Sequence, residues 1–466
     1  MKRLWKSIPP CLSDVMGFQA VINETEGFGI VDDPSTYKFV PLAGEEGHQR
    51  GGGGRPSGGF GGHGGFEGKA AGRSEGGFEK HGKPGLGGGR EGFGGHGGRG
   101  HEGGFGGHGS FGGDSMGRGE GRGGRGEGGK PAGMPGQRLV TSNLRNEDII
   151  TGTEAKLMEA FENGVKVLGT PDFVLLCNAP SSSMISSDLE GAAEKITGKG
   201  QIPAGRLNIH GDKDYAYGAS QALEGIGRLI LEPGSKQEKT VNILGCNRID
   251  WLDEETDELK KALEAAGWKV LSAWGARHMT TASLKESTDA SVNLVVNVSG
   301  MALAEYMQQE FDIPFVAGAP FGKKQLTEIL KLLEEAAGKP GERFALPYEP
   351  CEGGPEALVI GEQFRAAAIR AALAEKGYKN IKVLSFMEME KSLMAGEDRK
   401  LNSEDDLEQA ASAESVRLIA GAPDFMAAAK RDDVKWISLT AESLSPVERE
   451  KPVNMIGGRL EEFLNK

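Results

Sequence analysis

The sequence predicts an α/β protein of three doubly wound, Rossmann-like subdomains with parallel sheets, interrupted by a glycine- and histidine-rich insertion. From about Arg138 onward, apolar segments of five to seven residues alternate with helical segments. The apolar segments carry no polar face, which is typical of parallel strands covered by helices on both sides. Residues 51–130 differ sharply, because 40 of these 80 residues are glycine and no apolar period is visible.

Residues 1–45 form the amino-terminal part of the predicted first subdomain, and residues 138–236 form the rest of it. The first part holds two short apolar runs and then a turn signal, Asp32-Asp33-Pro34-Ser35. In the second part, PDFVLLCNAP (Pro171–Pro180) predicts a buried strand that runs into a loop. Helices are expected near Leu189–Thr197 and Tyr217–Leu231.

The second and third subdomains are predicted over residues 237–346 and 347–466. In the second, strands at Val241–Gly245, Lys269–Ala273 and Ser291–Gly300 alternate with helices at Glu254–Ala266, Thr281–Ser287, Met301–Phe311 and Lys323–Ala337. In the third, EALVIGE and the strands Ile381–Phe386, Val416–Ala420 and Val434–Leu439 accompany helices at Gln363–Glu375 and Arg459–Asn465. Strands that alternate with helices in this way indicate βαβ units.

The insertion, residues 46–137, cannot bury enough apolar surface to offset its chain entropy, so we expect it to be disordered. Three interpretations of its role stay open. It is a solvated linker, a tract that collects metal ions through imidazoles, or an RNA-binding segment with Arg-Gly repeats such as those in Arg118–Gly129. Residues 51–130 carry only 11 basic against eight acidic side chains, which argues against RNA. The metal interpretation uses His63, His81, His96, His101 and His108.

The overall composition excludes several classes of protein. The formal net charge of −13 argues against non-specific binding to nucleic acid or to anionic membranes. No apolar run approaches the roughly 18 residues of a membrane-spanning helix. The start of the chain has no apolar core of a secretory signal before Pro9. Four scattered cysteines without a CxxC pair predict reduced thiols and a cytoplasmic protein.

Standard nucleotide-binding and catalytic motifs are absent from the sequence. No GxxxxGK[ST] occurs, and GxGxxG occurs only inside the low-complexity insertion, where it has no strand before it. HExxH and GxSxG are also missing. We therefore expect no ATP or NAD site of a standard type in this chain.

In open α/β sheets, ligands bind beyond the carboxyl ends of the strands. Polar residues and cysteines at the predicted strand ends are therefore candidate site residues; they are Cys177, Ser181–Ser183, Cys246, Asn247, Arg248, Arg277, His278, Ser299 and Glu362. The alternative is that these side chains only cap helices and satisfy loop backbone groups, as Ser187 or Asp188 would for the helix at Leu189.

Several strings in the chain resemble the nitrogenase component 1 family. VNILG opens the second α/β unit, SVNLVVNVSG lies inside it, and LVIGEQ opens the third. The opening IPPCLSDVMGFQAVINETEGFGIVDDP and the strand-loop LLCNAPSSSMISSDLEG also fit the family. The resemblance covers residues 1–40 and 138–466 and implies the three-subdomain fold. It also implies an iron–sulfur cluster at a subunit interface, reduced by a separate ATP-hydrolysing iron protein.

The resemblance further implies up to three cluster cysteines from the first subdomain. Cys11 stands where the first is expected, and Cys177 lies a few residues before the third. Asp32-Asp33-Pro34-Ser35 stands where the second would be, so the set is incomplete. Two identical chains at a two-fold axis would still supply four thiolates, enough for one [4Fe–4S] cluster. The alternative is that both cysteines only pack. The family's later cofactor ligands have no match here, since neither Cys246 nor His278 has the expected setting.

The leading functional hypothesis is a nitrogenase component 1-like oxidoreductase subunit with an unknown substrate. It would take electrons from an iron-protein-like reductase and pair with a second copy or a related component 1 chain. The other hypothesis is a non-catalytic scaffold that holds a metallocluster or metal for assembly. The missing second cysteine and the histidines favour the scaffold, whereas the fold and the polar strand ends favour the enzyme.

Overall fold

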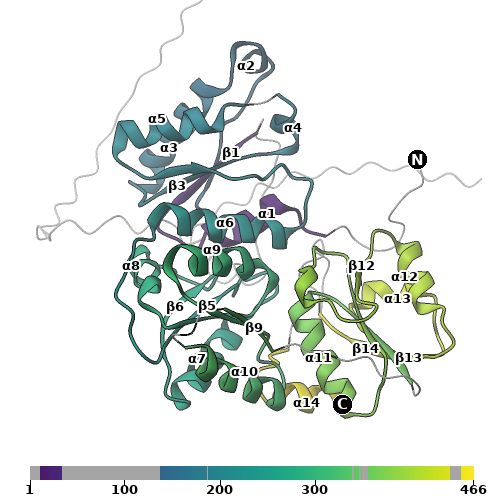
Figure 1. Cartoon of the computed structure of the whole chain (residues 1–466). Helices are drawn as coiled ribbons and strands as arrows, with labels where there is room; N and C mark the ends of the chain where they lie inside the picture. The colour runs from purple at the N-terminus through teal and green to yellow at the C-terminus, as the bar shows by residue number, and fades with distance from the viewer. Residues whose placement is uncertain are drawn as a thin grey trace, which may run out of the picture. The chain divides into compact units, whose positions relative to one another are not determined.

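The computed structural model of the chain describes residues 11–33, 137–185, 187–337, 339, 341–345, 348, 355–440 and 453–465. All of these belong to one compact unit, formed by Met1–His48 and Gly129–Lys466. Figure 1 labels its helices and strands along the chain. The insertion, with the predicted disorder and the six histidines at or within it, lies outside the described residues.

The first sheet has the strand order β2-β1-β3-β4, and its strand pairings are parallel. Its strands are β1 (Phe28–Asp32), β2 (Leu139–Thr141), β3 (Val174–Asn178) and β4 (Ala204–Arg206). The accompanying helices are α1 (Asp14–Ile22), α2 (Asn146–Thr151), α3 (Glu154–Leu168), α4 (Pro180–Ser183), α5 (Leu189–Gly200) and α6 (Tyr215–Ile230). Strands β1 and β3 are buried along their whole length, which explains their lack of a polar face.

Helices α1 and α6 pack directly against each other, and small residues make this contact. A Cβ atom on Gly17 would clash with the backbone carbonyl of Tyr215, and one on Gly218 would clash with the carbonyl of Asp14. Every residue of α1 is buried. The apolar run at Phe18–Ile22 is therefore part of a buried helix, fixed in place just after Cys11.

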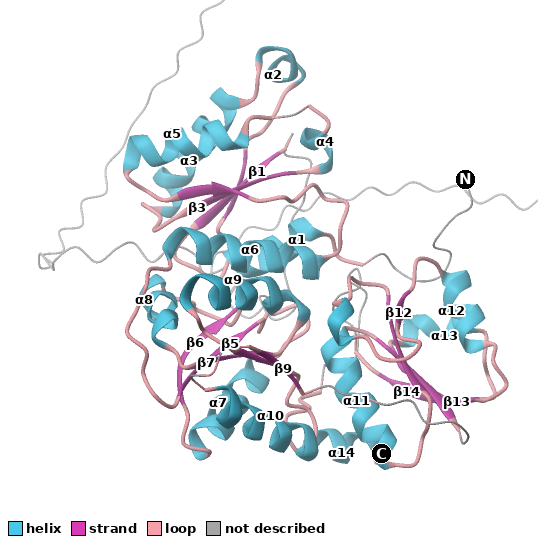
Figure 2. Cartoon of the chain, viewed as in Figure 1, coloured by secondary structure: helices cyan, strands magenta, loops and turns pink. Residues whose placement is uncertain are grey.

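The second sheet has the order β6-β5-β7-β8-β9, again with parallel pairings. Its strands are β5 (Thr240–Leu244), β6 (Lys269–Trp274), β7 (Val292–Val295), β8 (Phe315–Ala317) and β9 (Glu342–Phe344). Its helices are α7 (Asp253–Ala265), α8 (Thr281–Lys285), α9 (Met301–Phe311) and α10 (Lys323–Ala336), with 3-10 turns η2 (Glu286–Asp289) and η3 (Val298–Gly300). Figure 2 shows α9 on one side of this sheet and α7 and α10 on the other.

The third sheet has the order β12-β11-β10-β13-β14 and parallel pairings. Its strands are β10 (Glu356–Ile360), β11 (Ile381–Ser385), β12 (Arg399–Lys400), β13 (Val416–Gly421) and β14 (Lys435–Ser438). The helical elements are α11 (Gln363–Glu375), η4 (Lys391–Leu393), α12 (Glu404–Ala411), η5 (Pro423–Phe425), α13 (Met426–Ala429) and α14 (Arg459–Leu464).

The predicted fold class is confirmed: three parallel sheets are each accompanied by helices. One predicted strand is too long, because Ser291–Gly300 is a strand only over Val292–Val295. Asn297 then caps η3 through its side chain, which accepts the Ser299 N–H, so the chain turns away from the sheet. The subdomain boundaries at 237 and 347 remain predictions.

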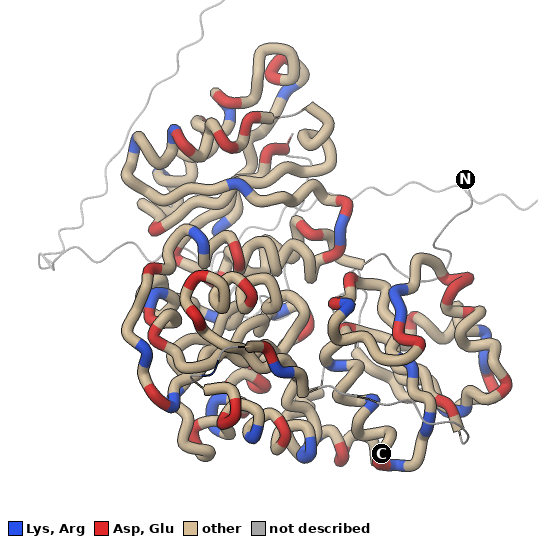
Figure 3. The backbone as a smooth tube through the Cα atoms, viewed as in Figure 1, with Lys and Arg blue, Asp and Glu red and all other residues tan. Residues whose placement is uncertain are grey.

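Charged positions of both signs are interspersed along the described helices and loops (Figure 3). Neither sign of charge is confined to one of the described helices or sheets. The ion pairs that matter for the architecture are the few buried ones, since exposed pairs contribute little to stability.

Candidate functional site

Each sheet reverses its strand order at one point, and at each of these points polar side chains gather at the carboxyl ends of the strands. The reversals fall between β1 and β3, between β5 and β7, and between β10 and β13. Such switch points form the crevices where ligands bind in open α/β sheets. The three switch points, called the first, second and third crevice below, contain several of the residues that the strand-end rule selects from the sequence, among them Ser181, Asn247 and Glu362.

The first crevice holds two adjacent buried carboxylates, Asp32 and Asp33. Ser142 and Ser187 donate their hydroxyls to the two oxygens of Asp32, at 2.6 and 2.5 Å. Burial raises the pKa of Asp32, and the two hydroxyls oppose this rise. Each oxygen of the Asp32 carboxylate therefore has one hydroxyl donor.

Asp33 is only partly satisfied within the part of the chain that the structure describes. Ser181 donates to its Oδ1 at 2.8 Å, and its backbone N–H donates to Ser142 Oγ at 2.9 Å. Its Oδ2 is buried and has no hydrogen-bond partner among the described residues, and neither has Oδ1 of Asn178. Buried oxygens without a partner are rare, because each costs about 1–3 kcal/mol. Two of them lie at the same sheet edge, which makes this crevice a candidate site for a ligand that supplies positive charge or hydrogen-bond donors.

Cys177 lies in β3, paired in register with Val31, and its side chain is 0 % exposed. Burial, followed by the charges of Asp14 and Asp32, raises the pKa of its thiol well above the ordinary value. The neutral thiol is therefore the stable form in this environment. Cys177 packs in the large apolar cluster together with Val31 and Ala179.

Cys11 has a different environment, at the point where residues from all three sheets meet. It is half-buried and packs against a small cluster that contains Tyr215 from α6, Ile249 from the loop after β5 and Met387 from the loop after β11. Burial raises the pKa of its thiol to about 12, the charges of Asp214 and Asp250 add to this effect, and Lys400 opposes it. The two predicted cluster cysteines thus lie in separate apolar clusters.

The second crevice is filled by an amide–hydroxyl network. Asn247, after β5, donates from its Nδ2 to Ser299 Oγ at 3.0 Å and to Asn297 Oδ1 at 3.3 Å. The loops approach closely only because Gly300 has no side chain, since a Cβ there would lie 2.7 Å from the carbonyl oxygen of Leu244. The sequence-predicted residues Asn247 and Ser299 are thus brought together, and they satisfy each other.

The third crevice begins with Glu362, which caps α11 and also reaches the second sheet's loop. Its Oε2 accepts the N–H of Arg365 at 2.9 Å, and its Oε1 accepts the N–H of Val298 at 3.2 Å. Burial raises the pKa of Glu362, and these backbone N–H groups lower it in part. The capping role of Glu362 is therefore confirmed, and its role in a site remains a prediction.

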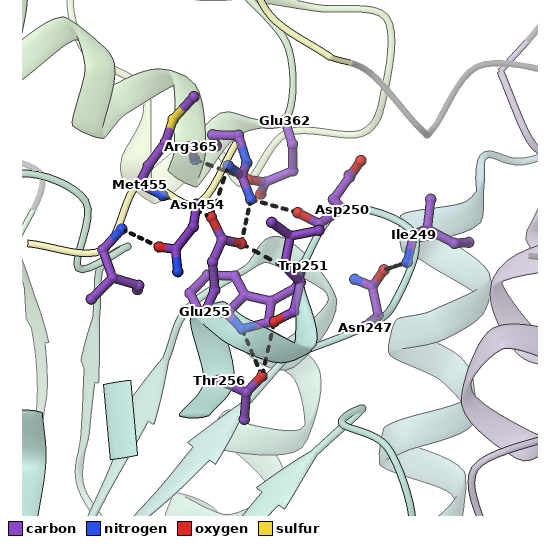
Figure 4. Close-up of polar contacts among 12 residues, drawn as sticks. Asn247, Ile249, Asp250, Trp251, Glu255, Thr256, Glu362, Arg365, Asn454 and Met455 are labelled. Carbon is purple, nitrogen blue, oxygen red and sulfur yellow. Dashed lines mark hydrogen bonds and ion pairs between the residues drawn. The ribbon is translucent and has the colours of Figure 1, made fainter. Parts of the chain in front are cut away.

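Next to Glu362, the guanidinium of Arg365 lies beside Asp250, in the loop after β5, and Glu255, in α7 (Figure 4). It contacts both oxygens of Glu255, with Nη2–Oε2 at 2.9 Å and Nη1–Oε1 at 3.3 Å, and donates to the Asp250 carbonyl at 2.6 Å. It also stacks on the Phe321 ring, 4.4 Å from the centroid. Neither Arg365 nor Glu255 is among the residues predicted from the sequence. The only signal for them is that charged residues stand in the first turns of α7 and α11.

The other predicted strand-end residues have structural partners. Arg248 pairs with Glu24 at 2.8 Å, and Arg277 pairs with Asp253 at 3.2 Å. Burial raises the pKa of the Cys246 thiol to about 12. The backbone of His278 donates to Glu24 at 3.1 Å, so this residue has a role in holding the first sheet's loop to the second.

His63, His81, His96, His101 and His108 lie outside the described residues, so their predicted metal binding remains a prediction. Among the residues that the structure does describe, no group of three or more His, Cys, Asp or Glu side chains is placed to hold a metal ion. The described helices also include none that is both long and apolar enough to cross a lipid bilayer.

Comparisons with known proteins agree with this architecture. One of the subunits of the light-independent protochlorophyllide reductase of Leptolyngbya boryana is 26% identical over 241 residues, which cover 44% of this chain and 47% of that protein. The corresponding protein of Heliobacterium modesticaldum is 23% identical over 206 residues, which cover 43% and 39%. The chain thus spans about half the length, or less, of these curated relatives.

A solved structure titled "Nitrogenase Cp1 at pH 6.5" superimposes with a TM-score of 0.56 at 16% identity, covering 71% of this chain and 82% of that one. At this identity the likeness concerns the fold. Residues 108–441, well over half of the chain, match the family described as nitrogenase component 1 type oxidoreductase. The chain therefore belongs to the nitrogenase component 1 type oxidoreductase family.

Proposed function

We propose that this chain is an oxidoreductase subunit that accepts electrons from an ATP-hydrolysing iron-protein partner through an iron–sulfur cluster at a subunit interface. The observation that carries the proposal is the buried Oδ2 of Asp33, just after β1, which has no hydrogen-bond partner among the residues that the structure describes. It occupies the place where the family resemblance leads us to expect a second cluster cysteine. We propose that this carboxylate oxygen takes the place of the missing thiolate as a cluster ligand.

The residues present fit such a group in part. Cys11 is half-buried, whereas Cys177 is fully enclosed. Iron binding would replace the proton that the raised pKa of the Cys11 thiol otherwise retains. Asp33 offers a carboxylate oxygen, and Rieske centres show that cluster iron accepts ligands other than cysteine. Cys177 fits less well, because its thiol is fully enclosed and would need to be uncovered. Cys11 and Cys177 remain the ligands proposed from the sequence. The described residues of one chain place no three such groups together, so Asp33 is proposed as a further donor only in an assembly with a second chain.

A second component 1 chain, identical or related, would complete the ligand set at the interface. When bound, a cluster of this kind supplies a one-electron store between the reductase partner and the substrate. This chain's own contribution is to hold the thiol and the carboxylate in fixed positions. Ser181 orients the Asp33 carboxylate through its Oδ1, and the buried helix α1 anchors the residues that follow Cys11.

The test is iron and sulfide analysis of the full chain, purified without oxygen and then reconstituted. Cys11→Ala, Asp33→Ala and Cys177→Ala are each expected to lower bound iron and sulfide at least twofold. Cys246→Ala is the matched control, because the Cys246 side chain is as buried as that of Cys177 but lies in the loop after β5 of the second sheet. A wild-type chain that stays free of iron under full reconstitution, alone and with a related partner chain, overturns the cluster.

Electron transfer is tested separately by mixing the loaded protein with a reduced iron-protein partner and ATP. Oxidation of the partner that continues over many turnovers supports the enzyme. Transfer of a whole cluster to an acceptor protein, without such turnover, supports the second candidate, a metallocluster scaffold. The feature that favours the scaffold is the run of histidines in the insertion beside an incomplete cysteine set.

The insertion has its own test. Deleting Gly51–Lys130 is expected to lower bound nickel, zinc or copper if the five histidines collect metal. Unchanged metal content after the deletion would assign the segment the role of a linker.

A further inference from the structure

The second and third sheets are joined by a buried chain of charges that centres on Arg365. Its guanidinium is enclosed by Glu255, the Asp250 carbonyl and the Phe321 ring, all of which belong to the second sheet's subdomain. Glu362, three residues earlier in α11, accepts the N–H of Val298 from the same subdomain. The start of α11 therefore makes two kinds of hydrogen bond to the loops of the second sheet: Arg365 donates to the Asp250 carbonyl, and Glu362 accepts the Val298 N–H.

Glu255 is the meeting point of three segments and is 0 % exposed. Besides Arg365, it accepts the N–H of Leu252 at 3.1 Å at the start of α7 and the N–H of Met455 at 3.1 Å from the carboxyl-terminal segment. That segment also pairs with Phe321 through Ile456. Arg365 and Met455 thus reach this carboxylate from outside the second sheet's part of the chain, whereas Leu252 binds it from the start of its own helix.

The loop between these contacts leads to Cys11. Asn247 fixes the loop by accepting the N–H groups of Ile249 (3.2 Å, at its side chain) and Trp251 (3.0 Å, at its backbone carbonyl). Ile249 then packs in the small cluster that Cys11 contacts, and the Asp250 charge acts on the Cys11 thiol. Arg365 binds the backbone of the residue that follows Ile249.

We propose that Glu362, Arg365 and Glu255 form a clamp that positions the loop Asn247–Trp251 and thereby fixes the surroundings of Cys11. These three are positioning residues, because none of them touches Cys11. Loosening the clamp is expected to release the loop while the three sheets stay folded. The clamp's importance for activity rests on the proposed function, but its effect on the loop is measurable whether or not Cys11 binds iron.

The clamp differs from an ordinary interdomain ion pair, and the chain offers a matched example of the latter. Arg459 of α14 pairs with Glu258, one turn further along the same helix α7, and this arginine is 54 % exposed. An exposed pair of this kind contributes little and leaves no buried charge when it is removed. Arg459→Lys is therefore the control for Arg365→Lys, while Glu362→Gln changes the carboxylate and keeps its shape.

The experiment is peptide-resolved hydrogen exchange on the full chain, wild type and variants. In Glu362→Gln and Arg365→Lys, amide exchange in residues 246–252 and 11–16 is expected to rise at least fivefold, and iodoacetamide should label Cys11 at least threefold faster. Exchange in β5 and β7, and labelling of Cys177, should stay at the wild-type rate. Arg459→Lys should match the wild type throughout.

Two outcomes would overturn the clamp. In the first, exchange changes only at the amides that lose a direct partner, those of Val298 and Arg365, and the loop and Cys11 are unaffected. In the second, the loop, β5 and Cys177 all become accessible together, so that the variants simply unfold.

Discussion

The guanidinium of Arg365 lies against the carboxylate of Glu255, which is 110 residues earlier in the chain, with Nη2 and Oε2 2.9 Å apart. Both side chains are buried or nearly so. Glu255 lies in the first turn of α7, which packs on the second sheet, and Arg365 lies in the first turn of α11, which packs on the third. Two similar links tie the other pairs of sheets: Arg248 to Glu24, and the Glu388 N–H to the Asp214 carboxylate at 2.5 Å. Carboxylates thus hold all three sheet-bearing parts together, with Cys11 near two of the links.

Arg365→Met should destabilise the protein strongly, because it leaves the Glu255 carboxylate buried without its cation. Breaking a buried pair from one side costs about 3–5 kcal/mol. Arg459→Met removes an exposed pair with Glu258 and should change the free energy of unfolding by less than about 1 kcal/mol. Urea denaturation followed by circular dichroism compares the two. Equal, small losses would show that the Arg365 pair is worth no more than a surface contact.

Asn242→Ala should also be destabilising, because Asn242 is the centre of a buried polar network in the second sheet. Its Nδ2 donates to the Ser287 carbonyl and to Asn293 Oδ1, both at 2.8 Å, and its Oδ1 accepts from Ser272 at 2.8 Å. Alanine leaves these partners without a hydrogen bond, and each buried group left unsatisfied lowers the free energy of unfolding by about 1–3 kcal/mol. The control is Asn208→Ala, whose amide bonds to Tyr217 at the surface and should cost less than about 1 kcal/mol. A thermal midpoint no lower than that of the control would contradict the network's role.

The sequence was sufficient to predict the sheets, because buried parallel strands are apolar on both faces and their ends are marked by polar residues. Asn247, Ser299 and Glu362 could be chosen as site candidates for this reason, and the structure brings the first two into contact. The pairings themselves could not be predicted. Arg365 and Glu255 lie within charged helix starts that read as ordinary capping, and only the tertiary fold shows that the two starts face each other.

Burial limited the prediction for the cysteines in a similar way. Position along the chain selected Cys11 and Cys177 together, yet Cys177 is enclosed in the core whereas Cys11 lies among loops of three sheets. The burial of Asp33 could not be predicted for a different reason. Its sequence context, Asp-Asp-Pro-Ser, is a common turn, and nothing in it signals that one carboxylate oxygen is buried without a partner in the described chain.

Glu362→Gln should change how stability depends on pH. The pKa of Glu362 in the folded protein is raised above 4.5, mainly by burial, so the folded state holds this proton more tightly than the unfolded state. Its contribution to stability is thus complete below about 4.5 and is lost as pH rises through the raised pKa. Glutamine cannot ionise, so the variant does not lose stability in this way. The difference in thermal midpoint, variant minus wild type, should therefore increase from pH 4 to pH 7. A difference between the two thermal midpoints that stays constant over this pH range would contradict this.

Gly218→Ala should disrupt the contact between α1 and α6 that holds the segment after Cys11. A Cβ on Gly218 would overlap the Asp14 carbonyl. The atoms that it meets belong to the backbone of α1, so the clash cannot be relieved by turning a side chain. We expect a loss of about 1–3 kcal/mol, as for other overpacked sites, and faster hydrogen exchange over residues 14–22. Gly198→Ala in α5 is the control: a Cβ there meets nothing within 4 Å, and alanine favours the helix by about 0.5–1 kcal/mol. The two substitutions should therefore shift the thermal midpoint in opposite directions, and a shift of both in the same direction would show that the close helix contact does not constrain α1.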